Sequence, residues 1–196
     1  MMRDPRGVTL IEVTLAMALV AVLLGLSLPA LTARGEAVEV LGAARYLAGE
    51  VARARAIAVR RGTAIGLRFL PEDDGFRVQA YADGNGNGVR QTDIARGIDE
   101  PVEAPFRLRE PFPGVRVARN AAVPSIGRGV AGATDAGALR LGAGGILTLS
   151  PLGTATGGTI YLLGRGGGQA AVRVLAATGR VRVMTYDAGA GEWRSR

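Results

Sequence analysis

The sequence predicts an α+β fold in which one long amino-terminal helix packs on antiparallel strands. Residues 13–31 contain no charged side chain, and the helical pattern that begins there continues to residue 61. After Gly62, apolar residues alternate with polar ones, as in half-buried strands. Most of the 30 glycines and nine prolines also lie in this second part, where they indicate many turns.

The first segment of the chain, residues 8–31, is long enough to cross a membrane. Its 24 residues contain one charged side chain, Glu12, and at about 1.5 Å each they span a hydrocarbon layer of about 30 Å. A secretory signal peptide has a shorter apolar core and carries its charges before that core. Since an ionisable group within a spanning segment is costly, Glu12 is a candidate functional residue. Arg3 and Arg6 before the segment predict that the carboxyl-terminal part lies on the outer side.

Residues 32–62 are expected to form an amphipathic second half of the same helix. Apolar residues recur there at three- and four-residue spacing, and Glu and Arg side chains lie largely between them. Arg60 and Arg61 suit the negative end of a helix dipole, and Gly62 suits a helix stop. One face of this half is therefore expected to be buried against a globular core.

Residues 63–196 are expected to form a β-rich head without a further long helix. The segment 84–112 is expected to be a long irregular connection. The strands are expected at residues 64–70, 76–82, 115–119, 139–141, 146–149, 159–163, 170–176 and 180–186.

The run Gly7-Val8-Thr9-Leu10-Ile11-Glu12 resembles the class III leader of type IV pilins and of type II secretion pseudopilins. The resemblance implies that residues 1–7 are a leader, which prepilin peptidase removes between Gly7 and Val8 before the new amino terminus is methylated. Val8 departs from the phenylalanine usual in the family. The resemblance also implies that Glu12 pairs with the terminal amine of a neighbouring subunit during fibre assembly. Pro29 then stands where pilins have a helix-bending proline.

Within this superfamily, the closing strands resemble those of the GspH/FimT group of minor pseudopilins. The residues that carry this resemblance are 158–162, 171–174 and 178–183. It implies a structural subunit held in the inner membrane, with its head in the periplasm, that assembles with other pseudopilins in a type II secretion or type IV pilus fibre. An enzyme is not expected, because the chain has no cysteine or histidine from which common nucleophilic or zinc sites are built.

Four arginines form a candidate DNA contact. Gly179-Arg180-Val181-Arg182 is similar to the GRxR motif of FimT-like minor pilins, which implies DNA contact during natural transformation. On a strand Arg180 and Arg182 share one face, and Arg173 and Arg165 extend the patch if residues 170–176 pair with 180–186. Residues 104–196 contain 12 arginines and four acidic residues, whereas residues 1–103 contain 12 and 13. The alternative is an ordinary half-exposed strand in a chain whose basic residues are all arginine.

A calcium site is a second candidate. Asp83, Asn85 and Asn87 place oxygen ligands at alternate positions before Gly88, as in calcium-binding loops, and Asp93 is the following carboxylate. It lies one residue short of the position where such loops have their final acid. The alternative is a turn-rich loop ordered by hydrogen bonds from its Asp and Asn side chains. No other cofactor is expected.

Overall fold

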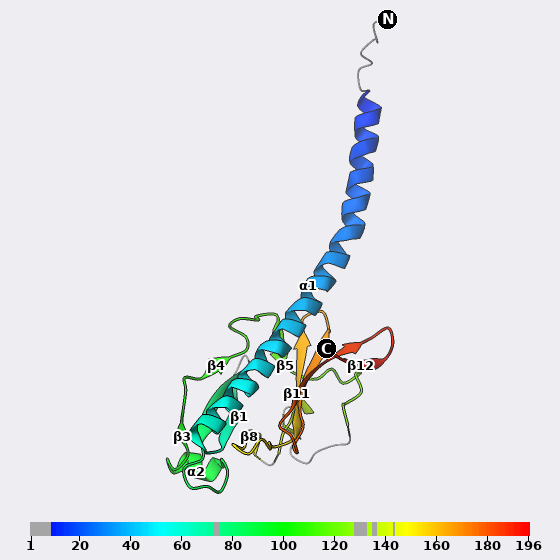
Figure 1. The fold of residues 1–196 in the computed structure, drawn as a ribbon. Helices are drawn as coiled ribbons and strands as arrows, with labels where there is room; N and C mark the ends of the chain where they lie inside the picture. Colours follow the sequence, from blue (N-terminus) through cyan, green and yellow to red (C-terminus); the bar gives the residue numbers. More distant parts are fainter. Residues whose placement is uncertain (1–8, 73–74, 128–132, 135–136, 143) are drawn as a thin grey trace, which may run out of the picture. The chain divides into compact units, whose positions relative to one another are not determined.

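The computed structural model describes residues 9–72, 75–127, 133–134, 137–142 and 144–196 (Figure 1). For residues 25–34 and 133–134 it describes the backbone alone. The chain divides into two compact units, Met1–Gly35 and Glu36–Arg196. The predicted cleavage site, Gly7 and Val8, lies outside the described residues.

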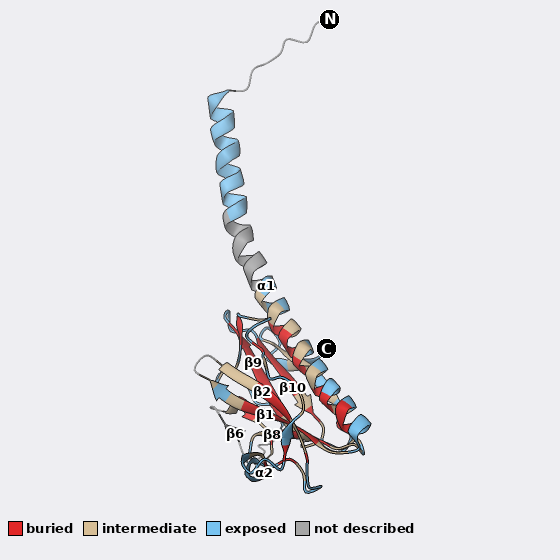
Figure 2. Ribbon diagram, turned by 90° about the vertical axis from the view of Figure 1, so that its left-hand side faces the viewer, coloured by how far each residue is buried: buried red, intermediate tan, exposed pale blue. Residues whose placement is uncertain are grey.

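Helix α1, Leu10–Arg61, contributes to both units and is 52 residues long. In the first unit its described side chains are exposed along the whole run 10–24 (Figure 2). Helix α1 continues through Pro29, so the proline does not end it. The bend expected at Pro29 stays a prediction.

In the second unit, α1 has one buried face, as the spacing of its apolar residues predicted (Figure 2). The helix ends at Arg61, and Gly62 follows with a φ of 65°. A residue in this left-handed region commonly follows a helix, and glycine adopts it without steric cost. The buried residues of this face are Val40, Ala43, Ala44, Leu47, Val51, Ala54, Ile57 and Ala58.

The strands of the head form two antiparallel sheets. The first sheet has the order β3-β2-β1-β8, with β4 also paired to β2. The hairpin of β1 and β2 runs in register from Ile65↔Ala82 to Glu72↔Gly75. The strands of this sheet are β1 (Ile65–Glu72), β2 (Gly75–Ala82), β3 (Glu100–Pro101), β4 (Phe106–Arg107) and β8 (Ile146–Leu149).

The second sheet has the order β12-β11-β10-β9-β7-β6, with β5 also paired to β9. The hairpin of β10 and β11 that the sequence suggested is confirmed, and it turns at Gly179, whose φ is 58°. The strands of this sheet are β5 (Val115–Val117), β6 (Ala133–Thr134), β7 (Leu139–Arg140), β9 (Gly158–Gly164), β10 (Gln169–Val174), β11 (Val181–Asp187) and β12 (Glu192–Ser195).

The buried face of α1 and one face of each sheet share a single hydrophobic core. The opposite face of the second sheet carries an aromatic cluster. There the ring of Trp193 lies 5.8 Å from that of Tyr161 and 5.6 Å from that of Tyr186, and its indole nitrogen donates to the carbonyl of Pro124. Trp193 therefore holds β12 and the segment that contains Pro124 against the second sheet.

The α+β fold and all the expected strands are confirmed, with shifts of a few residues at their ends. The expectation of an irregular segment over residues 84–112 was partly wrong. It contains the five-residue helix α2 (Gln91–Ala95) and the short strands β3 and β4. Elements this short have too few residues to show a periodicity in the sequence.

Leu47 provides a test of the shared core, because its side chain is 1% exposed. We expect Leu47→Ala to lower the free energy of unfolding by about 2–5 kcal/mol, through lost burial and the cavity left behind. Leu152→Ala is the matched control, since Leu152 is 91% exposed and should change stability little. Denaturant unfolding of the full chain in detergent micelles measures both, and equal values for the two variants would contradict the packing described.

Candidate functional site

The first turn of α1 is closed by reciprocal hydrogen bonds between Thr9 and Glu12. The backbone N–H and the hydroxyl of Thr9 donate to Glu12 Oε2 at 3.3 and 3.4 Å. The N–H of Glu12 lies 3.4 Å from Thr9 Oγ1, to which it donates. This is a capping box, in which the two side chains reciprocally accept hydrogen bonds from backbone N–H groups at the start of the helix. Its signature, Thr-x-x-Glu before an apolar run, was present in the sequence, so Thr9 could have been found there.

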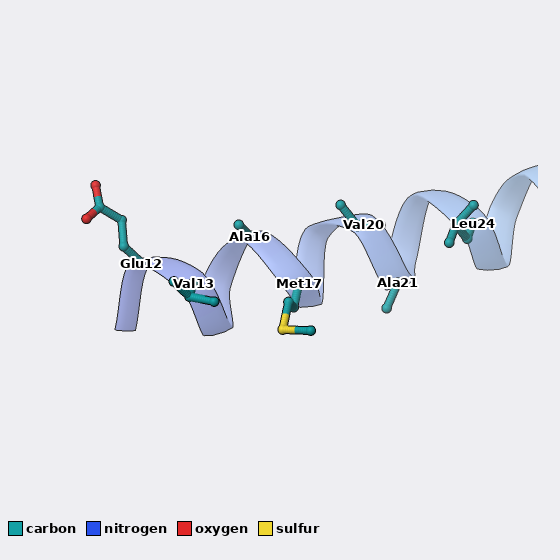
Figure 3. A pocket seen from close by; sticks show the side chains of 7 residues that line it. All are labelled: Glu12, Val13, Ala16, Met17, Val20, Ala21 and Leu24. Atoms are coloured by element: carbon teal, nitrogen blue, oxygen red, sulfur yellow. The ribbon is translucent and has the colours of Figure 1, made fainter. Parts of the chain in front are cut away.

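An apolar groove continues from Glu12 along α1 (Figure 3). Large apolar side chains are exposed all around this part of the helix, including Leu15 at 61% and Met17 at 69%. Such a surface requires lipid or other protein to cover it, because a soluble monomer seldom exposes so large an apolar area. The groove is lined by Glu12, Val13, Ala16, Met17, Val20, Ala21 and Leu24.

Among the described residues, no helix is both long and apolar enough to span a membrane.

The loop between β2 and β3 brings together the residues of the predicted calcium site. The side-chain amides of Asn85 and Asn87 both donate to Asp93 Oδ2, at 3.3 and 3.0 Å. Asp83 accepts backbone N–H groups through both of its oxygens, including that of Gly88 at 2.8 Å. Asp83 and Asp93 are buried, so these bonds replace the water that the carboxylates lose on folding.

Asp99 completes this loop, and the sequence analysis did not single it out. Its side chain is 1% exposed and accepts the N–H groups of Gly84 at 3.0 Å and of Arg90 at 2.9 Å. Among the residues that the structure describes, no group of three or more acidic, histidine or cysteine side chains could hold a metal ion. The hydrogen bonds described here order the loop, and calcium binding stays a prediction.

Three of the four predicted DNA-contacting arginines lie close in the second sheet. Arg173 on β10 is directly opposite Arg182 on β11. Arg180 precedes β11 and, like Arg182, is exposed. Arg165 is not part of this group, because it follows β9 near Gly164, whereas Arg173 pairs with Thr159 at the other end of that strand. The guanidinium of Arg165 donates instead to the carbonyl of Pro113, at 3.2 Å.

Comparison with known proteins identifies the amino-terminal part of the chain. Residues 2–28 match the prokaryotic N-terminal methylation motif. The chain is 42% identical, over 82 residues, to the pilin-like protein PilA1 of Thermus thermophilus. This match covers 42% of the chain and 51% of the relative, so the chain spans about half the length of that relative. No solved structure matches the chain.

The motif and this similarity, together with the α+β fold, support a protein of the type IV pilin superfamily. The methylation motif also suggests that the protein is anchored in a membrane.

Asp93 gives the loop a predictable response to acid. The hydrogen bond from Asn87 is the largest cause that lowers the pKa of Asp93 below its ordinary value of 3.8, whereas burial acts in the opposite direction. A carboxyl with a lowered pKa in the folded state stabilises the fold above its unfolded pKa, and this contribution is lost as the pH falls through the folded value. We therefore expect the free energy of unfolding to decrease below about pH 4 and Asp93→Asn to weaken that decrease.

Denaturant unfolding between pH 2 and pH 7 measures this effect. Glu100→Gln is the control, because Glu100 is exposed and should leave the pH dependence unchanged. A pH dependence that is the same in Asp93→Asn and in the unsubstituted chain would contradict the assignment.

The calcium hypothesis has a separate test. Binding of an ion to the folded state alone raises the melting temperature of a protein. The hypothesis therefore predicts a higher melting temperature in millimolar calcium than in a chelator, and loss of the difference in Asp83→Asn. Equal melting temperatures in calcium and in chelator would overturn it.

Proposed function

We propose that this protein is a minor subunit, of the GspH/FimT type, in a type II secretion pseudopilus or a type IV pilus-like fibre. Prepilin peptidase would cleave between Gly7 and Val8, and residues 8–31 would hold the precursor in the inner membrane with its head in the periplasm. Its partners would be other major and minor pseudopilins, and its role would be structural. The exposed apolar surface of α1 carries the proposal, because assembly into a fibre core would cover it.

Glu12 would have two roles: it caps its own helix, and it pairs with the terminal amine of an adjacent subunit. The capping box engages Oε2, and no described residue donates a hydrogen bond to Oε1. A carboxylate accepts several hydrogen bonds, so the capped side chain can also accept the terminal amine of an adjacent subunit. Pairing with that amine would neutralise the charge within apolar surroundings and set the axial position of one subunit against the next.

Two substitutions distinguish the capping role of Glu12 from the role of its negative charge. Glutamine can replace glutamate in a capping box, whereas it removes the negative charge. We therefore expect Glu12→Gln to insert in the membrane normally yet fail to enter fibres, and Thr9→Ala, which loses the cap hydroxyl, to enter them. Quantification of the variants in sheared fibres and in membranes measures both steps. Normal incorporation of Glu12→Gln would refute the charge-pairing role.

Processing is tested on the purified mature chain. Intact-mass measurement should show a chain that begins at Val8 and carries one added methyl group. A mature chain that retains Met1 or Met2 would overturn the whole proposal, because the fibre subunit requires a free amine at the start of the helix.

DNA contact in natural transformation is a second candidate function. The direct pairing of Arg173 with Arg182 supports it, since like charges at opposed positions repel and an anion relieves the repulsion. We expect the full chain in micelles to bind duplex DNA. In the double variant Arg180→Ala, Arg182→Ala, the slope of the logarithm of the binding constant against the logarithm of salt concentration should become smaller by about 0.9 for each lost phosphate contact. Arg165→Ala is the control, because the structure places Arg165 elsewhere. No binding of DNA at low salt would refute this function.

A further inference from the structure

Four strands of the second sheet align one polar residue each in a single row across the sheet. Arg140 on β7 is opposite Thr159 on β9, and Thr159 is opposite Arg173 on β10. Arg173 is in turn opposite Arg182 on β11. We call Arg140, Thr159, Arg173 and Arg182 the arginine row.

The arginine row lies on the face of the sheet that points away from the hydrophobic core. Side chains alternate between the two faces of a strand, and the neighbours of the row along each strand belong to the core. These neighbours are Leu139, Ile160, Val172 and Val181.

The arginine row concentrates positive charge that no described acidic side chain neutralises. Among the described residues, no acidic side chain forms an ion pair with Arg140, Arg173 or Arg182. Nη1 of Arg140 is also buried and has no hydrogen-bond partner among the described residues. A buried donor without a partner is costly, and two cations at directly opposed positions repel each other. An oxyanion bound at the surface of the row would relieve the repulsion between the cations.

A hollow of about 350 Å³ adjoins the row, and its lining combines Thr159 and Arg173 with three glycines and with Ile126, Val174, Leu175 and Ala176. Gly127 lies so close to Arg173 that a Cβ atom there would be 3.4 Å from Nη2. The hydroxyl of Thr159 is a further donor beside the guanidinium of Arg173.

Strand spacing sets the length of ligand that the row fits. Neighbouring strands lie about 4.8 Å apart, so Arg140 and Arg173 are separated by about 10 Å, with Thr159 between them, and Arg182 lies about 5 Å further. Guanidinium groups bind phosphate oxygens through two parallel donors. A ligand that satisfies the row is therefore an extended polyanion with more than one phosphate.

We propose that the arginine row is a phosphodiester-binding site in which Arg140 and Arg173 hold one phosphate of a DNA backbone over Thr159, and Arg182 holds the next. This inference rests on the DNA-contact candidate above and adds Arg140 and Thr159 to it. Arginine and threonine at these positions meet phosphates rather than base edges, so recognition is independent of base sequence.

The test uses the full mature chain in detergent micelles and a 20-base-pair duplex, with affinity measured over a range of salt concentrations. Arg140→Gln should reduce affinity at low salt several-fold and lower the salt slope by about 0.9, equally for duplexes of different sequence. Arg116→Gln is the matched control, because Arg116 pairs with Leu163 on β9, away from the row. The melting temperature of Arg140→Gln should not fall, since the substitution removes an unpartnered buried donor.

Inorganic phosphate provides a readout that does not depend on DNA. Phosphate at tens of millimolar should raise the melting temperature of the unsubstituted chain above its value in chloride at equal ionic strength, and Arg140→Gln should abolish the rise. One outcome would refute this inference and leave the DNA-contact function standing. In that outcome the double variant Arg180→Ala, Arg182→Ala binds DNA more weakly, whereas Arg140→Gln leaves the salt slope of binding unchanged. Absence of DNA binding by the unsubstituted chain would overturn both.

Discussion

The contact between α1 and the inner faces of the two sheets holds the head together, because the sheets share none of the described strands. Small residues of the helix, such as Ala43 and Ala44, are 0% exposed in this core. Leu47 and Val51 are larger helix side chains buried in the same core. In its first unit the same helix exposes apolar side chains on every side. One helix therefore buries a single face in the head and, in its first unit, exposes an apolar surface that requires cover on every side.

Glu12 shows how one side chain can stabilise its own helix and still be available to a partner. The hydrogen bonds with Thr9 fix the first turn and hold the carboxylate beside the helix start. That position is favourable for a negative charge, because the helix dipole is positive there. In the proposed pairing, a terminal amine would meet an acid whose position is already fixed, so less conformational entropy would be lost.

Two sets of charged groups in the head differ in whether the fold itself supplies their partners. Asp83 and Asp99 are buried, and backbone N–H groups of their own loop satisfy them. The folded chain alone accounts for these charges. Arg140 and Arg173 are only partly exposed, and no described acid pairs with them. Cations that remain costly in the isolated head are the better candidates for a ligand site than acids that the fold has already satisfied.

The sequence by itself determined the helix, its end at Gly62 and the main strands, because a period of 3.6 or 2 is a local property of a long segment. Strands of two residues, such as β3 and β6, exist through pairing with distant partners and have no local pattern. The capping threonine was readable from the Thr-x-x-Glu spacing.

Only the tertiary structure decided which arginines share a site. The register of β7, β9, β10 and β11 joins Arg140 to Arg173 and separates Arg165 from it. Register is set by packing across pairs that lie far apart in the sequence, and a shift of one residue would move every side chain of a strand to the opposite face.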